Sequence, residues 1–239
     1  SKTVLGFVVP RKGSDEDDFV ADLVAQAVAW LGHTRIIVKA DGEPAIQALV
    51  KRVLELVKVE CEDLDQAAKE DLAAYDSQSN GGTEQGIRLI RGLFRTVKLC
   101  LEERINKFIP IDHPIIHWMM EHVCLLLNVM VRGDDSLTSW ARIRGRAFHQ
   151  QLVGFAERVL YKFPGKGPRH APYGNMGATG GEGVFLGYNR QSNAFIVATE
   201  SGIVMARSIT RRPERERWQA EALARVRETP GALKARAER

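Results

Sequence analysis

Along the first 60 positions, short apolar runs alternate with apolar residues at the three-to-four-residue spacing of a helix. These patterns predict, in order, a strand, a helix, a strand and a helix, over residues 4–10, 19–31, 35–39 and 44–57. Gly32 marks the end of the first helix. Pro44 suits the first turn of the second helix, because N–H groups there have no acceptor within the helix and proline lacks this group. This order of elements predicts a layered α/β fold.

The later segments carry different patterns. Residues 59–76 are acidic with little periodicity, and residues 77–83 (S-Q-S-N-G-G-T) are typical of a turn-rich loop. Further helices are predicted at 84–107, 112–131 and 136–145. Short β-type runs, separated by Pro, Gly and turn residues, follow at 158–163, 183–188, 194–199 and 203–209. They predict a small antiparallel β module, followed by an Arg- and Glu-rich stretch typical of a frayed helical tail.

The composition of the 239 residues is that of an ordinary soluble globular protein, with 44% hydrophobic and 27% charged residues. No apolar stretch is long enough to span a membrane, and the start of the chain shows no secretory signal. Three widely spaced cysteines, Cys61, Cys100 and Cys124, fit a reducing nuclear or cytoplasmic compartment. Because the chain begins with Ser1, we expect its true N-terminus to lie upstream.

Charge is distributed unevenly behind a net charge of +4. Residues 1–80 carry 9 Lys and Arg against 15 Asp and Glu, whereas residues 81–239 carry 25 against 15. A basic segment of this length is typical of a protein with a polyanionic partner, most simply nucleic acid. A solvated surface explains the same charge equally well.

Two acidic residues stand at positions suited to chemistry. Asp41 directly follows the strand at 35–39, and side chains at such strand ends line the sites of open α/β sheets. Glu84 follows a glycine-rich loop and opens the long helix. Carboxylates from a strand end and a helix are the ligands that Mg²⁺ needs for phosphoryl transfer. Each residue also has a simpler role, because an acid at a helix start is favourable in itself.

Glu84 belongs to a charged stripe on its helix. Four cations follow it at spacings of four and three residues: Arg88, Arg91, Arg95 and Lys98. This spacing places all five side chains on one side of the helix. An adjoining apolar stripe, which runs from Ile87 to Leu101, is expected to pack on the core. The charged face is either a solvated surface or one that tracks a phosphate backbone beginning at a metal site.

Several segments resemble the catalytic core of retroviral and copia-like retrotransposon integrases, which belong to the DDE or RNase H-like superfamily. Residues 36–46 (I-I-V-K-A-D-G-E-P-A-I) resemble its second-aspartate segment. Residues 77–87 (S-Q-S-N-G-G-T-E-Q-G-I) resemble its glutamate segment, in which a Ser-Asn-Gly loop precedes the catalytic Glu. Residues 93–98, the helix with Trp118 and Asn128, and residues 142–148 resemble the helical remainder of that core. Residues 183–189 and 203–212 resemble the β module that follows copia-like cores.

The resemblance implies three parts. These are an RNase H-like core that is truncated at its N-terminus and lacks the first strands (1–155), a small β-barrel-like DNA-binding module (156–212) and a charged tail (213–239). It also implies DNA end processing and strand transfer. Asp41 and Glu84 would then be catalytic and hold Mg²⁺ or Mn²⁺, while Asn80 and Gly81 would lie in a flexible loop that contacts DNA. The implied partners are retroelement ends, target DNA and further copies of the chain, with no membrane.

The chain departs from the family in two ways. Asp41 and Glu84 are 43 positions apart, more than is usual in retroviral members, and the acidic stretch 59–76 can hold the extra length. The family's first catalytic Asp and its zinc-binding segment are absent, because the sequence opens at what resembles a later strand. We therefore expect the chain to be inactive alone. Two alternatives stay open: a DNA-binding or assembly module without chemistry, and another RNase H-like nuclease that cleaves without joining.

Overall fold

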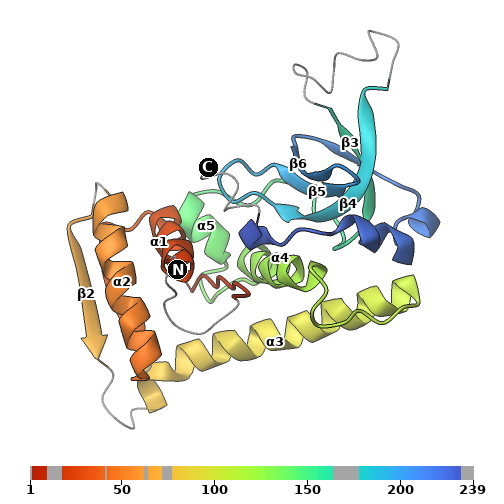
Figure 1. Ribbon diagram of the computed structural model, residues 1–239. Coiled ribbons are helices and arrows are strands. Elements are labelled where there is room, and N and C mark those ends of the chain that lie inside the picture. The colour runs from red at the N-terminus through yellow and green to blue at the C-terminus, as the bar shows by residue number, and fades with distance from the viewer. Residues whose placement is uncertain are drawn as a thin grey trace.

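A five-stranded antiparallel sheet and a long helix dominate the computed structural model, which describes residues 2–9, 18–40, 42–61, 64–71, 77–163 and 178–232 (Figure 1). For residues 60, 71 and 77–80 the backbone alone is described. The helices are α1 (Phe19–Leu31), α2 (Pro44–Glu60), α3 (Ser77–Ile105), α4 (Ile115–Met130) and α5 (Ser139–Arg144). The strands are β1 (Arg35–Ala40), β2 (Gln66–Asp71), β3 (Arg158–Lys162), β4 (Gly180–Tyr188), β5 (Phe195–Thr199), β6 (Gly202–Ala206) and β7 (Ile209–Arg211). This mixture of helices and strands confirms the α/β class.

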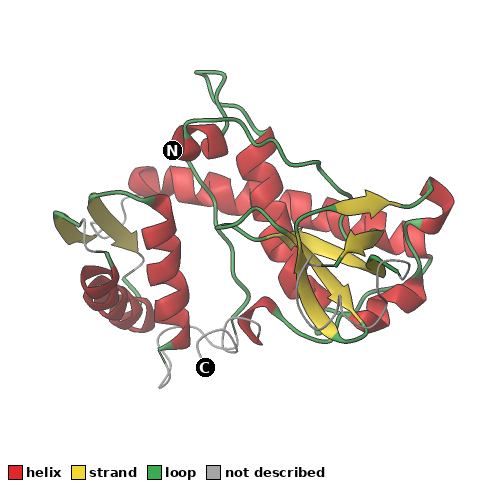
Figure 2. Ribbon diagram, turned by 90° about the horizontal axis from the view of Figure 1, so that it is seen from above, coloured by secondary structure: helices red, strands yellow, loops and turns green. Residues whose placement is uncertain are grey.

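The N-terminal unit contains α1, β1, α2 and β2. As predicted, α1 ends at Gly32, which adopts a left-handed φ of 67°, and Pro44 opens α2. β1 and β2 pair in parallel, with Arg35 opposite Gln66 at one end. β2 was not predicted, because its sequence Q-A-A-K-E-D lacks the apolar and β-branched residues that mark strands. Figure 2 shows this pair of strands and the five-stranded sheet at opposite ends of the molecule.

The strand predicted at 4–10 is wrong for the described residues 4–9, which form no strand. Pro10 lies outside the described residues. The Asn128 side chain takes the place of a neighbouring strand: its Oδ1 accepts the Val4 N–H at 2.9 Å, and its Nδ2 donates to the Val4 carbonyl at 2.7 Å. The Ser139 hydroxyl donates to the carbonyl of Lys2 at 3.1 Å. Side chains of α4 and α5 therefore satisfy backbone groups of Val4 and Lys2 in this segment.

α3 begins at Ser77, so the turn-rich loop predicted at 77–83 is wrong, and these residues are helical. Its end at Ile105 lies close to the predicted one. Gly81 and Gly82 each cost about 1 kcal/mol relative to alanine in a helix interior. Extension of an existing helix adds one hydrogen bond per residue, so a long helix can continue through such positions. Figure 1 shows α3 running from the N-terminal unit to the far end of the molecule.

The helices predicted at 112–131 and 136–145 are confirmed as α4 and α5. The Thr138 hydroxyl caps α5 by accepting the N–H of Ala141 at 3.2 Å, and Gly145 ends the helix with a left-handed φ of 66°. None of the described helices is long and apolar enough to cross a membrane.

The predicted antiparallel β module is present as the sheet β6-β5-β4-β3-β7. Four strands follow one another as a meander, and β7 returns to pair with β3. The single strand predicted at 203–209 is two strands, because the chain leaves β5 after Ala206 and joins β3 from Ile209 onward. Both central strands, β4 and β5, are buried along most of their length.

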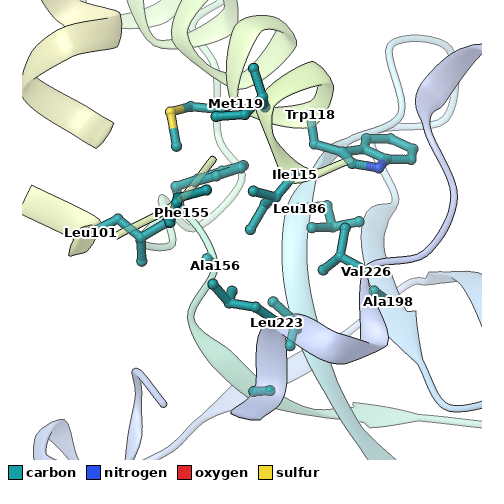
Figure 3. Close-up of a cluster of buried hydrophobic side chains, with 14 of the residues drawn as sticks. Leu101, Ile115, Trp118, Met119, Phe155, Ala156, Leu186, Ala198, Leu223 and Val226 are labelled. Atoms are coloured by element: carbon teal, nitrogen blue, oxygen red, sulfur yellow. The ribbon is translucent and has the colours of Figure 1, made fainter. Parts of the chain in front are cut away.

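The largest hydrophobic cluster joins α3, α4, β4, β5 and the segment after the sheet (Figure 3). That segment contains two 3₁₀ helices, Glu214–Glu216 and Ala220–Arg225, and it buries Leu223 and Val226 against the sheet. The frayed tail predicted after residue 211 is therefore wrong up to residue 232, and residues 233–239 lie outside the described residues. The cluster contains residues on both sides of position 155, and the division there into sequence domains stays a prediction.

Candidate nucleic-acid interface

Asp41 lies outside the described residues, directly after Ala40, the last residue of β1. The structure therefore gives no distance between the Asp41 and Glu84 carboxylates, and their pairing in a metal site stays a prediction. Among the residues described, no group of three or more His, Cys, Asp or Glu side chains gathers as a metal site would require.

Glu84 lies within α3, and its side chain is exposed. Asn80 and Gly81, predicted in a flexible loop, are helical residues of the same α3. Gly81 is exposed, and the side chain of Asn80 is outside the described part. Any contact that these residues make with DNA would thus come from a helix end. Glu84 is the one predicted metal ligand among the described residues, and its exposed side chain is accessible to a metal ion from solvent.

Three cations of the predicted stripe are available to bind an anion from solvent. Arg88, Arg91 and Arg95 are exposed, and none forms an ion pair with a described residue. They extend over about 10 Å of the helix axis, at a rise of about 1.5 Å per residue. The same helix buries Leu101 and Ile105 in the main cluster, so the arginines stand on a firmly packed element.

Lys98, the fourth cation of the stripe, is engaged within the protein. Its ammonium forms an ion pair with Glu102 and lies 4.5 Å from the centre of the Phe108 ring, and its side chain is only 17% exposed. The Ile109 N–H and the Lys98 ammonium lower the pKa of the Glu102 carboxyl, which favours its charged form. Lys98 thus offers less to a phosphate than its three neighbours.

A groove of about 720 Å³ runs beside the first half of α3. Its walls come from residues 2–5, 82–90 and 127–142. Ile87 and Leu89, which are 43% and 47% exposed, line the α3 wall. Here the apolar stripe of α3 extends past the core that covers its second half. The groove joins segments far apart in the chain, and sequence reasoning missed it for that reason.

A further cationic surface, also missed, lies at the end of α5. The guanidinium carbon of Arg144 stands 4.4 Å from the centre of the Trp30 ring, and Arg146 is exposed just beyond the helix. The run R-I-R-G-R at 142–146 was the available signal. The contact between Arg144 and Trp30 could not be inferred from the sequence, because the two residues are far apart along the chain.

No protein-family model matches this chain, and no curated protein does. Among solved structures, the chain is similar to one in the cryo-electron microscopy structure of a simian T-cell lymphotropic virus intasome in complex with the PP2A regulatory subunit B56 gamma. The TM-score is 0.41 and the sequence identity 14%, over 86% of this chain. The chain spans 66% of the length of that protein, just under two thirds.

Proposed function

We propose that this chain is an integrase-like DNA-binding protein whose helix α3 contacts the phosphate backbone. One observation carries this proposal: Arg88, Arg91 and Arg95 are exposed on one side of a long, packed helix without an ion-pair partner among the described residues. Phosphate contacts of this kind position a nucleic acid without reading its sequence. The resemblance of residues 36–46 and 77–87 to integrase segments makes DNA the expected polyanion.

The catalytic part of the proposal is DNA end processing and strand transfer in the complete protein. Asp41 and Glu84 would hold Mg²⁺ or Mn²⁺, which would activate the attacking oxygen and stabilise the leaving one. Glu84 shares its helix face with the arginines, so a backbone that follows Arg95, Arg91 and Arg88 would reach Glu84 next. Further copies of the chain are expected partners, on the ground of the resemblance alone.

The second candidate is a DNA-binding or assembly module without chemistry. Its support is that the exposed arginines of α3 can contact a phosphate backbone without a metal. Both candidates share the α3 interface, and they differ only in whether a metal binds.

Fluorescence anisotropy with a labelled DNA duplex tests the interface. Three phosphate contacts give a slope of about −2.7 in log K against log salt, or about 40-fold weaker binding at 200 mM than at 50 mM. The variant R88Q/R91Q/R95Q should reduce the slope by about 2.7 and lower affinity for all duplex sequences alike. A variant of equal charge, K51Q/K58Q/R215Q, alters exposed cations elsewhere and should keep the wild-type slope. An unchanged slope in the first variant would refute the α3 interface.

Binding of Mn²⁺ alone separates the two candidates without an activity assay. Electron paramagnetic resonance counts free Mn²⁺ in the presence of the full chain. If Asp41 and Glu84 hold the metal, wild type binds Mn²⁺, and D41N and E84Q each weaken binding at least about tenfold, while DNA affinity stays unchanged. Equal Mn²⁺ binding by wild type and both variants would support the module without chemistry.

A further inference from the structure

We propose that the ends of α5 and α1 form a second phosphate-binding surface, built from Arg144, Arg146 and Trp30. The surface extends the proposed function, on which it rests for the identity of its ligand, to a second segment of nucleic acid. The chain could then hold two backbone segments at once.

Trp30 is fixed where α1 meets the rest of the protein. Its indole Nε1 donates to the carbonyl of Arg190 at 3.1 Å, and its ring centre lies 6.0 Å from that of Trp140. The Arg144 guanidinium carbon lies 4.4 Å from the Trp30 ring centre and 5.9 Å from that of Trp140. Stacking on aromatic faces restrains the planar guanidinium while its N–H groups stay available at the edge. A restrained fork of donors is suited to bidentate binding of phosphate.

Arg142, on the same helix, differs from Arg144 because a carboxylate neutralises its charge. Its Nε donates to Asp135 Oδ2 at 2.9 Å, and a second nitrogen binds the other oxygen of that carboxylate. Arg144 and Arg146 have no such partner among the residues that the structure describes, and both are exposed. A cation in the last turn stabilises a helix end, which accounts for the charge of Arg144. It does not account for the stacking, nor for Arg146, which follows Gly145 and lies beyond the helix.

The surface faces away from the α3 stripe. On α5, Ser139 and Arg142 line the groove that α3 also lines, whereas Trp140 and Arg144 meet Trp30. The helical spacing between these pairs places them on different sides of α5. On α3, helical spacing places the arginine stripe opposite Gly86 and Leu89, which line the same groove. Both α3 and α5 contact α4. The groove therefore lies between the two surfaces, and Figure 1 shows α4 with α3 below it and α5 to its upper left.

Nucleic acid is the occupant that these residues favour over a lipid surface with the same phosphate chemistry. Peripheral membrane helices carry a wide exposed apolar face beside their cations. α5 has only six residues, and its Ser139 and Trp140 are buried. Just after it, Gly145, Arg146, Ala147 and His149 are exposed, whereas Phe148 is half-buried and packs its ring against that of Trp140. The surface therefore offers donors for phosphate without an apolar face that could enter a bilayer.

A bridging assay with the full chain tests this inference. Protein is loaded on a bead-bound DNA duplex, and capture of a second, fluorescent duplex is measured at several salt concentrations. Two phosphate contacts make capture about 12-fold weaker at 200 mM than at 50 mM salt. R144Q/R146Q should lower capture at least about tenfold and leave loading on the first duplex within about twofold. The matched variant K51Q/K58Q removes the same charge from α2 and should capture as wild type does.

Variants of Trp30 test the positioning of Arg144. W30F keeps an aromatic face and should retain most of the capture, whereas W30L should weaken it about 2- to 5-fold. Circular dichroism confirms that each variant is folded. If W30L unfolds, a second measurement is used: Arg144 is chemically cross-linked to the second duplex in wild type and in W30F. The yield of this cross-link decides whether the guanidinium contacts DNA.

Three results would overturn the second surface: wild-type capture by R144Q/R146Q, capture that depends on α3 alone, or binding of this surface to phosphatidylserine–phosphatidylcholine vesicles without duplex capture. The proposed function fails on a different result, namely first-duplex loading by R88Q/R91Q/R95Q that equals wild type. The two failures are therefore read from different variants.

Discussion

Arg211 holds Glu157 through two hydrogen bonds, from Nε to Oε1 at 2.7 Å and from Nη2 to Oε2 at 2.9 Å. The Glu157 side chain is completely buried, and Arg217 adds an ion pair to Oε1 at 3.2 Å. The N–H of Gly154 donates to Oε2 at 3.1 Å. One buried carboxylate thus ties β7 and the segment after it to the start of β3.

Replacement of Glu157 by glutamine should destabilise the protein by about 3 kcal/mol, because two arginines would face a neutral group at a completely buried position. Urea denaturation followed by tryptophan fluorescence measures the change. E200Q serves as the control, because the Glu200 side chain is 85% exposed and its one ion pair among the described residues is with Arg225. This change should cost less than about 0.5 kcal/mol. Equal stability of E157Q and E200Q would show that the buried ion pairs contribute nothing.

A buried histidine makes stability depend on pH. His122 lies between Phe155 and Phe185, with ring centres 5.1 and 5.8 Å apart, and its Nδ1 has no hydrogen-bond partner among the described residues. Burial lowers the pKa of His122 to about 4. The unfolded chain, with an ordinary histidine pKa of about 6.5, therefore binds this proton more readily than the folded chain does.

Stability should accordingly be complete above about pH 6.5 and fall as the pH drops toward 4, by about 3 kcal/mol in total. His122→Phe removes the titrating ring and should flatten this fall, as measured by urea midpoints between pH 7 and 4.5. Burial also lowers the pKa values of His113 and His117, so a smaller slope of the same sign should persist in the variant. A variant with the full wild-type slope would exclude His122 as its main source.

Local signals predicted the elements that depend on local rules. Gly32 and Gly145 adopt the left-handed conformation that ends a helix, and Pro44 begins one. β2 escaped prediction because a polar strand is held by its neighbour β1 and not by a pattern of its own. Residues 77–83 have the composition of a loop, yet they continue a long helix. The segment after residue 211 is held by the pairing of Arg217 with Glu157 and by Leu223 and Val226, which pack in the main cluster. These partners are distant in the sequence, and the charge pattern without them indicated fraying.

The candidate site likewise contains features that local sequence rules predict and a contact that they do not. The stripe from Arg88 to Arg95 follows from helical spacing alone, and the structure leaves these side chains exposed. The pairing of Lys98 with Glu102 also follows an i, i+4 rule and was available from the sequence. The contact between Arg144 and Trp30 joins residues 114 positions apart, so it could not be predicted.

Lys98 should behave as a structural cation and not as a phosphate contact. K98Q should leave the salt dependence of duplex binding unchanged, because its ammonium is already paired with Glu102, and should cost about 0.5 kcal/mol of stability. R91Q, the matched change about two helical turns away on the same stripe, should do the opposite and reduce the slope by about 1. Anisotropy titrations and urea denaturation of the two variants measure both effects. A reduced slope in K98Q would return Lys98 to the DNA-contacting set.

Asn128 should control the mobility of the N-terminal segment, because its side chain satisfies both backbone groups of Val4. Asn128→Leu keeps the size of the side chain and removes both bonds. The loss of about 1–3 kcal/mol of local stability should speed hydrogen exchange at the Val4 amide about 5- to 150-fold. Amides of β5, which lies elsewhere in the fold, serve as the internal control and should exchange as in wild type. Exchange at Val4 that does not change would mean that Leu5 and its neighbours hold the segment by packing, and that the Asn128 bonds are incidental.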